Sequence, residues 1–241
     1  TAVGKDALEA NTTASNNTAV GTKALEANTT GEQNVAVGSQ ALDALTTADH
    51  NTAVGYNSMS ATTTGSENTA VGQGSLGTNT TGANNTAIGH AALVLNTTAS
   101  NNTAVGKDAL FSNTTGAENV AVGTQSLDAC TTGETSTAVG YQALTAMTTA
   151  TGVTAVGQKA GGSLTTGNQN TLIGVGAGFE MTTGSNNLCL GNGAGRSASP
   201  SGQITTGSDA VCLGNNNIGD LFCADTSISS SDSRDKTDVE S

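Results

Sequence analysis

The chain contains very few large side chains. Aromatic residues make up 2% of its 241 positions, tryptophan is absent and proline occurs once, whereas glycine occurs 32 times. A globular core of interlocking large side chains is not expected, because the residues that would build it are missing. Low hydrophobicity alone would favour disorder. A strictly periodic chain, however, can bury small side chains by stacking one repeat on the next.

Basic residues are scarce as well. Seven Lys and Arg stand against 19 Asp and Glu, so the formal net charge is −12. This balance argues against nucleic acid as a partner, because nucleic acid is bound through basic faces. No apolar run approaches the roughly 18 residues that span a bilayer, so we expect no membrane insertion. The chain opens at Thr1 in the middle of its repeated phrase, and we expect it to be part of a longer protein.

One phrase, Asn-Thr-Ala-Val-Gly, returns along most of the chain. Its glycine recurs at a step of 17 residues from Gly4 to Gly191, and a further copy ends at Gly214 after a step of 23. The six inserted residues fall near 196–204, around the single proline, Pro200. A repeat of this regularity predicts an architecture of stacked, equivalent units.

Each repeat contains two short apolar runs. Thr-Ala-Val favours a strand with Thr and Val on one face and Ala on the other. A second run is formed by an Ala-Leu pair, such as Ala109-Leu110, and clusters of Gly and Asn-Thr-Thr mark the corners between the runs. The recurring glycine is expected to supply a positive φ or room for a close neighbour. Two short strands and two corners describe one coil of a β-solenoid.

We therefore predict an all-β protein, a parallel β-solenoid of about 13 coils spaced roughly 4.8 Å apart, over residues 1–214. Equivalent residues then form ladders, and asparagine ladders can exchange amide hydrogen bonds along the stack. Val105 and Leu110 are expected to be buried. The ladder of Val105 should include Val71, Ile88 and Val122.

The apolar content of one coil is small. A coil offers about four apolar side chains, and burying a Val or Leu contributes roughly 1.5–3 kcal/mol. Ordering the backbone costs about 1–2 kcal/mol per residue. A single-chain coil is therefore marginal, and three chains around a common axis would bury a second face. We predict a homotrimer with the form of a β-roll or a triple β-helix. The partners of each chain are then two further copies of the same chain.

The phrase NTAVG resembles the NSVAIG-type phrase in the head domains of trimeric autotransporter adhesins, which form trimeric left-handed parallel β-rolls. It also resembles repeats in the shafts of phage tail fibres, and the resemblance covers 1–214. It implies a structural and adhesive rod: a tail-fibre shaft of the virion, assembled in the host cytoplasm, that supports recognition of a cell-surface glycan or protein. The alternative is the passenger region of a trimeric adhesin on a bacterial cell surface.

A minor alternative is an ice-binding β-solenoid, because threonine ladders on a flat face can order water. The threonines here stand in adjacent pairs, however, and neighbouring residues of an extended chain point to opposite faces. This arrangement differs from a row in which every second residue is threonine.

The repeat ends after Gly214, where the composition shifts to Ser, Asp and Lys. We interpret 215–230 as a connecting segment. The sequence SDSRDK that begins at Ser231 resembles the opening of the endosialidase-type intramolecular chaperone, which phage fibres carry at their C-terminus. Residues 231–241 would then be the start of this auto-cleaving domain, with the rest absent.

The resemblance to that chaperone implies a Ser-Lys dyad. Ser231 would be the nucleophile, Lys236 its base, and the Ser230–Ser231 bond the one that is cut, with Asp232 and Arg234 in support. A Lys amine can act as a base when desolvation lowers its pKa. The chain itself is not expected to be an enzyme, although a full-length precursor would cut itself.

The remaining reactive residues predict no metal site and no cofactor. The four cysteines are Cys130, Cys189, Cys212 and Cys223, with no C-x-x-C spacing and no nearby histidine. Cys189 and Cys212 replace the alanine of the phrase. We expect them to be buried thiols in adjacent coils, as suits a reducing cytoplasm, with a disulfide as the alternative.

Histidine and tyrosine are expected on the surface. His50 and His90 fall at different repeat positions, so they form no ladder and are interpreted as solvated corner residues. Tyr56 and Tyr141 share the repeat position after the glycine. They are expected to rest on the rod surface, and contact with sugar is their alternative role.

Overall fold

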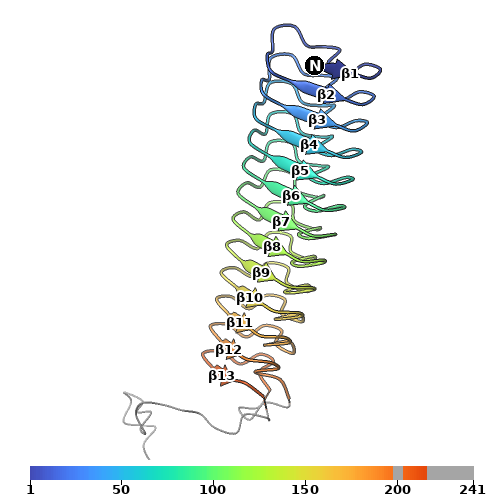
Figure 1. The fold of residues 1–241 in the computed structure, drawn as a ribbon. Coiled ribbons are helices and arrows are strands. Elements are labelled where there is room, and N and C mark those ends of the chain that lie inside the picture. The colour runs from blue at the N-terminus through green and yellow to red at the C-terminus, as the bar shows by residue number, and fades with distance from the viewer. Residues whose placement is uncertain (198–202, 216–241) are drawn as a thin grey trace, which may run out of the picture.

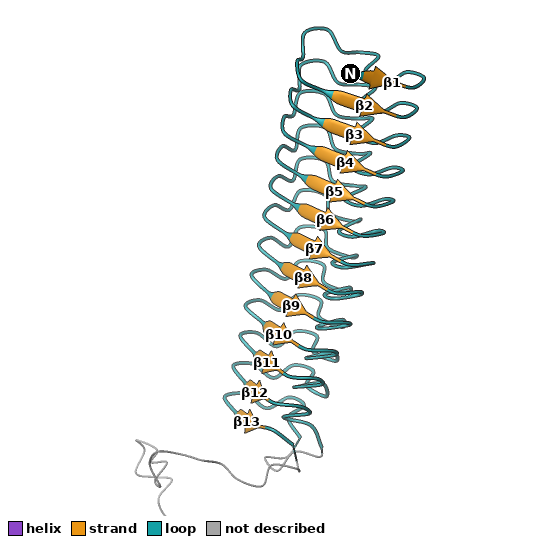
Figure 2. Cartoon of the chain, viewed as in Figure 1, coloured by secondary structure: helices purple, strands orange, loops and turns teal. Residues whose placement is uncertain are grey.

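The computed structural model describes residues 1–197 and 203–215. The predicted chaperone start, and all but the first residue of the predicted connecting segment, lie outside the described residues. The described chain winds into one elongated column of stacked coils (Figure 1). It contains 13 short strands in a single parallel sheet, with one strand in each coil and no helix among the described residues (Figure 2). The predicted parallel β-solenoid is confirmed.

The strands follow the order of the sequence across the sheet, β1 to β13. Their bounds are β1 Ala2–Val3, β2 Thr18–Val20, β3 Val35–Val37, β4 Thr52–Val54, β5 Thr69–Val71, β6 Thr86–Ile88, β7 Thr103–Val105, β8 Val120–Val122, β9 Thr137–Val139, β10 Thr154–Val156, β11 Thr171–Ile173, β12 Leu188–Leu190 and β13 Val211–Leu213. The last two strands pair in the same register although 23 residues separate them, with Cys189 opposite Cys212. The longer spacing therefore leaves the strand register unchanged.

Each of the three-residue strands, β2 to β13, presents its middle residue to the interior and its outer two residues to the surface. In β7, Ala104 is fully buried, whereas Thr103 and Val105 are half-buried. Val105 lies opposite Ile88 in β6 and opposite Val122 in β8, so the predicted ladder is present. The predicted division of Thr and Val from Ala is confirmed.

The second apolar run is not a strand, and the prediction of two strands per coil is wrong. Ala109 and Leu110 lie in consecutive turns, in which the N–H of Ala109 donates to the carbonyl of Gly106 (3.3 Å). The third residue of that turn, Asp108, has a φ of 55°, and its equivalent in the first coil, Asp6, has a φ of 58°. A type II turn requires a positive φ at this position. Leu110 also has a positive φ, 51°, and is fully buried.

A left-handed backbone costs a non-glycine residue roughly 1–2 kcal/mol. The same strain recurs at this leucine position from Leu8 to Leu144. We attribute its persistence to burial, because the left-handed turn directs a large side chain into the interior, where burial of a Leu contributes about 1.5–3 kcal/mol.

Neighbouring coils are joined by backbone hydrogen bonds in both directions. Around β7, the N–H of Thr103 donates to Asn119 of the next coil, and the N–H of Gly106 donates to Ile88 of the previous one (2.8 Å each). Gly106 has a φ of 138°, and a Cβ placed there would lie 2.6 Å from the carbonyl group of Gly123. The recurring glycine thus meets both expected requirements, positive φ and a close neighbour.

Two columns of buried asparagines also close the interior. In the first, the N–H of Asn119 donates to Oδ1 of Asn102 (3.0 Å). In the second, Nδ2 of Asn113 donates to Oδ1 of Asn96 (3.0 Å). The columns meet at the carbonyl of Gly116, which accepts from Nδ2 of both Asn102 and Asn113 (3.0 Å each). The predicted asparagine ladders are confirmed.

Leucine moves from the turn to the strand near the C-terminal end of the column. Gly161 and Gly178 occupy the position that holds Leu110 in its coil, and Leu172 replaces the strand alanine of β11. A Cβ on Gly161 would lie 2.7 Å from Cδ1 of Leu172, and one on Gly178 would lie 2.6 Å from its Cδ2. Leu172 therefore fills the space beside Gly178 and shares the space beside Gly161 with Leu144, whose Cδ2 would lie 2.6 Å from a Cβ there.

Candidate functional surfaces

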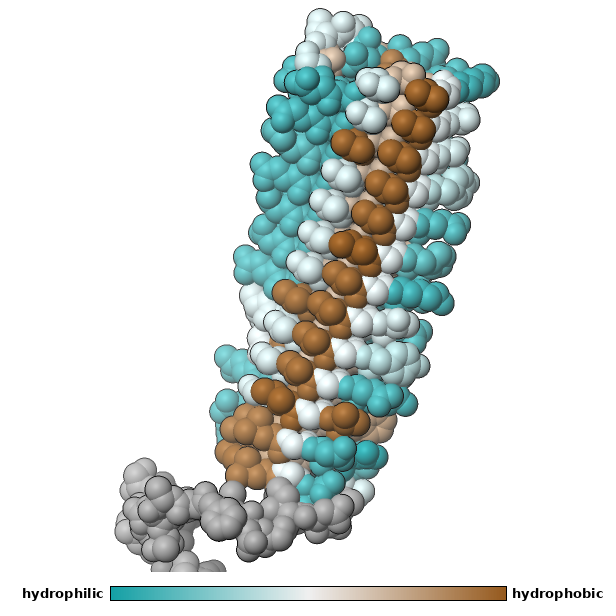
Figure 3. All heavy atoms as spheres, viewed as in Figure 1, coloured by the Kyte–Doolittle hydropathy of each residue, from teal (hydrophilic) through white to brown (hydrophobic). Residues whose placement is uncertain are grey.

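An apolar stripe follows the last residue of every strand along the outer face of the sheet. Figure 3 shows it as a nearly unbroken hydrophobic line from one end of the column to the other. Its members, here called the apolar stripe, are Val3, Val20, Val37, Val54, Val71, Ile88, Val105, Val122, Val139, Val156, Ile173, Leu190 and Leu213. Ile88 is 40% exposed and Ile173 is 42% exposed. The stripe is therefore a continuous apolar surface that the single chain leaves open to solvent.

The stripe changes the expected role of Val105. Leu110 is buried as predicted, but Val105 is only half-buried and its ladder neighbour Val71 is exposed. The prediction of a buried Val105 is therefore wrong for the single chain. The side chain points outward because the small Ala104 takes the inward position of the strand.

The paired threonines point in different directions, as the sequence predicted. Oγ1 of Thr114 donates to the carbonyl of Thr131 in the next coil (3.0 Å), whereas the adjacent Thr115 is exposed. The same pattern recurs in neighbouring coils, where Oγ1 of Thr97 donates to Thr114 (3.1 Å). Only one hydroxyl of each pair is thus presented to solvent at this corner.

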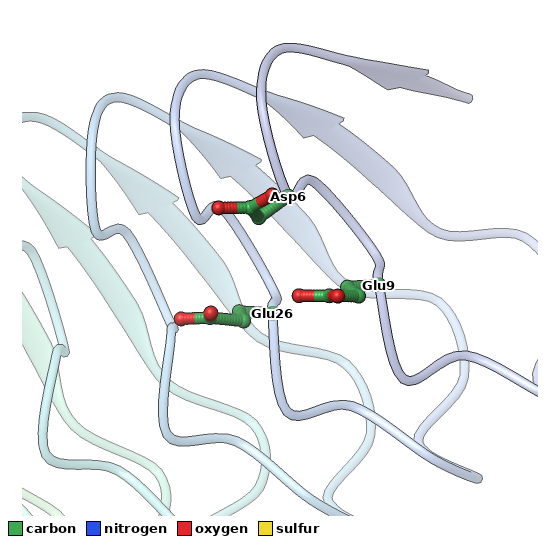
Figure 4. Close-up of side chains that lie close together, drawn as sticks. All are labelled: Asp6, Glu9 and Glu26. Atoms are coloured by element: carbon green, nitrogen blue, oxygen red, sulfur yellow. The ribbon is translucent and has the colours of Figure 1, made fainter.

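Three carboxylates gather on the first two coils. Oxygens of Asp6, Glu9 and Glu26 lie within 4.8 Å of one another (Figure 4). Two lysines offset their charge: Nζ of Lys5 lies 3.6 Å from Asp6, and Nζ of Lys23 lies 3.0 Å from Glu26. The hydrogen bond to Glu26 raises the pKa of Lys23. The cluster is an exposed acidic surface in which the lysines balance part of the repulsion.

A pocket of about 320 Å³ opens near the other end of the column. Its lining residues are Gln158, Lys159, Val175, Gly176, Phe179 and Arg196. The guanidinium of Arg196 lies over the ring of Phe179, 5.2 Å from its centroid. This site, here called the Arg196 pocket, was not predicted from the sequence. The sequence feature that could have indicated it is a drop in negative charge, because Glu180 is the only carboxylate between Thr135 and Ser197.

The three described cysteines are buried free thiols. This confirms the expectation for Cys189 and Cys212 in adjacent coils, and Cys223 lies outside the described residues. Burial raises the pKa of Cys130 to about 11. Burial, with a smaller contribution from Cys212, raises the pKa of Cys189 to about 12. A thiol is a nucleophile only as its thiolate, so these groups are chemically quiet at neutral pH.

The predicted surface residues lie on the surface. Tyr56 is 49% exposed and Tyr141 is 45% exposed, both directly after the coil glycine. His50 is exposed, and Nδ1 of the exposed His90 lies 3.7 Å from a carboxylate oxygen of Asp108. No imidazole ladder is formed.

The predicted self-cleavage residues, Ser230, Ser231, Asp232, Arg234 and Lys236, all lie outside the described residues. The Ser-Lys dyad therefore stays a prediction. Within 1–197 and 203–215, no helix has the length and apolar character that crossing a membrane requires.

Comparison with protein-family models, with curated proteins and with solved structures finds no match to this chain.

Proposed function

We propose that the protein is a structural and adhesive fibre, the trimeric shaft of a phage tail fibre that supports recognition of a host-cell receptor, a glycan or a surface protein. The observation that carries this proposal is the apolar stripe. It runs along one outer face through all 13 strands, in a chain whose interior is already filled by alanine, leucine and asparagine. A surface of this kind is suited to packing against copies of itself.

The size of the stripe supports a stable contact. Standard interfaces bury roughly 800 Å² per partner, so 13 strands need to supply about 60 Å² each. Val71, which is 36% exposed, and the half-buried Thr69 two residues before it can supply an area of this order. Because the strands are parallel and equivalent, three rods in the same orientation would match coil to coil.

The oligomeric state tests the proposal. Native mass spectrometry and light scattering should give three times the chain mass of 23.4 kDa. Val105→Asp would place three carboxylates near a common axis, and an unpaired buried charge costs several kcal/mol. We expect that variant to lose its trimers, while the matched variant Thr115→Asp, on an exposed corner, keeps them. A monomeric wild type, or equal behaviour of the two variants, would overturn the proposal.

The passenger region of a bacterial trimeric adhesin would use the same rod. The two candidates differ in the regions that adjoin the repeat. A virion-attachment domain or a chaperone domain in the same reading frame supports the tail fibre, whereas a coiled coil followed by a membrane β-barrel supports the adhesin. The SDSRDK sequence at Ser231 favours the first.

The proposal includes maturation by self-cleavage. In a protein that carries the remainder of the chaperone, Oγ of Ser231 would attack the carbonyl carbon of Ser230 while Lys236 takes the hydroxyl proton. The Ser230–Ser231 amide bond breaks as its nitrogen takes up that proton, and water then hydrolyses the resulting ester to leave a carboxylate at Ser230. Intact-mass measurement should then find a product that ends at Ser230, and Ser231→Ala should give one uncut chain that still assembles. A wild-type protein that matures without this terminus would refute the dyad.

A further inference from the structure

We infer that the Arg196 pocket binds a carboxylate-bearing sugar, such as a uronic acid residue of a cell-surface polysaccharide. The source of the ligand rests on the proposed function, whereas the chemistry of the pocket does not. A volume of about 320 Å³ accommodates a sugar ring. It also reaches the lower end of the range of roughly 300–1,000 Å³ that is typical of small-molecule sites.

The charge of this region is unlike that of the preceding coils. Residues 1–134 contain three lysines and eleven carboxylates, a net charge of −8 with histidine neutral. Residues 135–197 contain Lys159 and Arg196 against Glu180 alone, a net charge of +1. An anion is therefore repelled along most of the rod and attracted at the Arg196 pocket.

Arg196 has contacts on two sides. Below it lies Phe179, whose ring packs on Gly162: a Cβ placed on that glycine would lie 2.9 Å from the ring. Beside it, Nε of Arg196 lies 3.8 Å from Glu180. That carboxylate is in turn held by the N–H of Ser197 (2.9 Å). A guanidinium stacked on an aromatic face loses little freedom on binding a ligand.

The far end of the guanidinium faces the pocket. Glu180 lies at the Nε side of Arg196, whereas Nη1 lies 3.4 Å from the point where a Cβ on Gly176 would stand. Gly176 lines the pocket, and its missing side chain leaves room for this nitrogen. Guanidinium N–H groups bind carboxylates through charge-assisted hydrogen bonds. Arg196 is therefore the residue that we assign to the sugar carboxylate.

The other lining residues suit the rest of a sugar. Lys159 is exposed and, among the described residues, lies in no ion pair, so its ammonium can approach the same carboxylate or a hydroxyl. Gln158 offers an amide that both donates and accepts. Val175, which is 50% exposed, provides an apolar surface for the ring carbons. Cations, an amide and a small apolar wall are the complement of an acidic sugar.

Binding of free sugars to the whole chain tests the assignment. Glucuronate is the probe, with glucose as the neutral control and acetate as the carboxylate without a ring, measured by saturation-transfer NMR and calorimetry. We expect saturable binding of glucuronate only. Lys159→Gln and Arg196→Gln should each weaken it about tenfold or more, the loss expected for one hydrogen bond to a charged group. Lys107→Gln, which removes a lysine paired with Asp108 (3.3 Å), should leave it unchanged.

Three outcomes would overturn the inference: glucose binding as well as glucuronate, acetate competing equally, or Lys159→Gln having no effect. The last variant keeps the test valid if Arg196→Gln disturbs the coil, because Lys159 is exposed. Light scattering on the same samples separates this inference from the proposed function. A monomer that binds glucuronate refutes the shaft, and a trimer that ignores it refutes the pocket assignment.

Discussion

The coils before and after residue 160 place their large side chains at different positions of the interior, the turn and the strand. Up to Leu144, the strand centre is alanine and the turn holds a leucine or Met59; from Gly161 onward, the turn position is glycine and Leu172 stands in a strand. Both arrangements leave the same backbone path and the same strand register. The comparison teaches that this solenoid keeps its interior filled by sharing large side chains between neighbouring coils, as Leu172 does beside Gly161 and Gly178, rather than by fixing the residue at any one position.

Leu172→Ala should produce the largest effect, because it removes the leucine that fills the space beside Gly178 and, together with Leu144, the space beside Gly161. Large-to-small substitutions of buried leucine typically cost about 2–5 kcal/mol. Coils in a solenoid contact only their neighbours. The loss should therefore appear as faster hydrogen exchange in the coils around β11, with slower exchange retained near β4.

A second substitution should restore that loss and so sharpens the comparison. Gly178 has a φ of 61°, close to the 51° of Leu110, so a leucine can occupy it with the strain already present elsewhere. Leu172→Ala combined with Gly178→Leu recreates the arrangement of the earlier coils and should recover most of the protection. Gly178→Leu alone should destabilise, because its Cβ would lie 2.6 Å from Leu172. A double variant no more stable than Leu172→Ala would contradict the inference that a filled interior matters more than the residue at any one position.

Asn96→Leu should have a smaller effect. The substitution removes the donors to Oδ1 of Asn79 (2.9 Å) and to the carbonyl of Ala99 (3.0 Å), and it leaves the buried Asn79 oxygen without that donor. An unsatisfied buried acceptor costs about 1–3 kcal/mol. Chemical denaturation of wild type and variant measures the difference.

The end of the same asparagine column supplies the control. Oδ1 of Asn113 is already buried without a partner, because the next coil has Cys130 in place of asparagine. In Cys130→Asn, the new amide would donate a hydrogen bond to that oxygen. The new amide oxygen would in turn face Met147 of the following coil, which offers no donor, so the stability should change little. Equal losses for Asn96→Leu and Cys130→Asn would show that polarity, rather than hydrogen bonding, governs this column.

Alkaline pH is expected to lower the stability through the thiol of Cys189. The pKa of Cys189 is raised from 9.0 to about 12, so above pH 9 its thiol ionises in the unfolded chain while it stays protonated in the fold. The folded state then binds more protons, and stability falls as the pH rises from 9 toward 12. Cys189→Ala, which restores the residue found in most strands, should reduce the slope of the unfolding free energy between pH 9 and 11. An unchanged slope would contradict the assignment.

The period, the parallel stacking, the buried alanine and the asparagine ladders were all predictable, because strict repetition forces equivalent residues into register. The fate of Ala109-Leu110 was not. Short apolar runs do not distinguish a strand from a turn, and a left-handed leucine such as Leu110 is a rare choice that tertiary burial imposes. The outward position of Val105 could not be predicted either. Alternation along a strand shows which residues share a face, but it does not show which face is inside.

The candidate surfaces were less predictable than the fold. The Arg196 pocket depends on side chains from three coils, 17 or more residues apart, and only the drop in carboxylates after Glu134 hinted at it in the sequence. The acidic trio of Asp6, Glu9 and Glu26 likewise combines two coils. Sequence reasoning placed residues within a coil but did not combine neighbouring coils into sites.

The hydrogen bonds that join each coil to the coils on both sides have a consequence for how the molecule changes length. Removing or duplicating 17 residues rejoins equivalent positions, as Asn102 and Asn119 illustrate, and leaves every remaining interface intact. A gene with near-identical repeats can therefore lose or gain a unit by recombination. Each event would shorten or lengthen the rod by one increment of roughly 4.8 Å, so the reach of the molecule is inherited as a whole number of repeats.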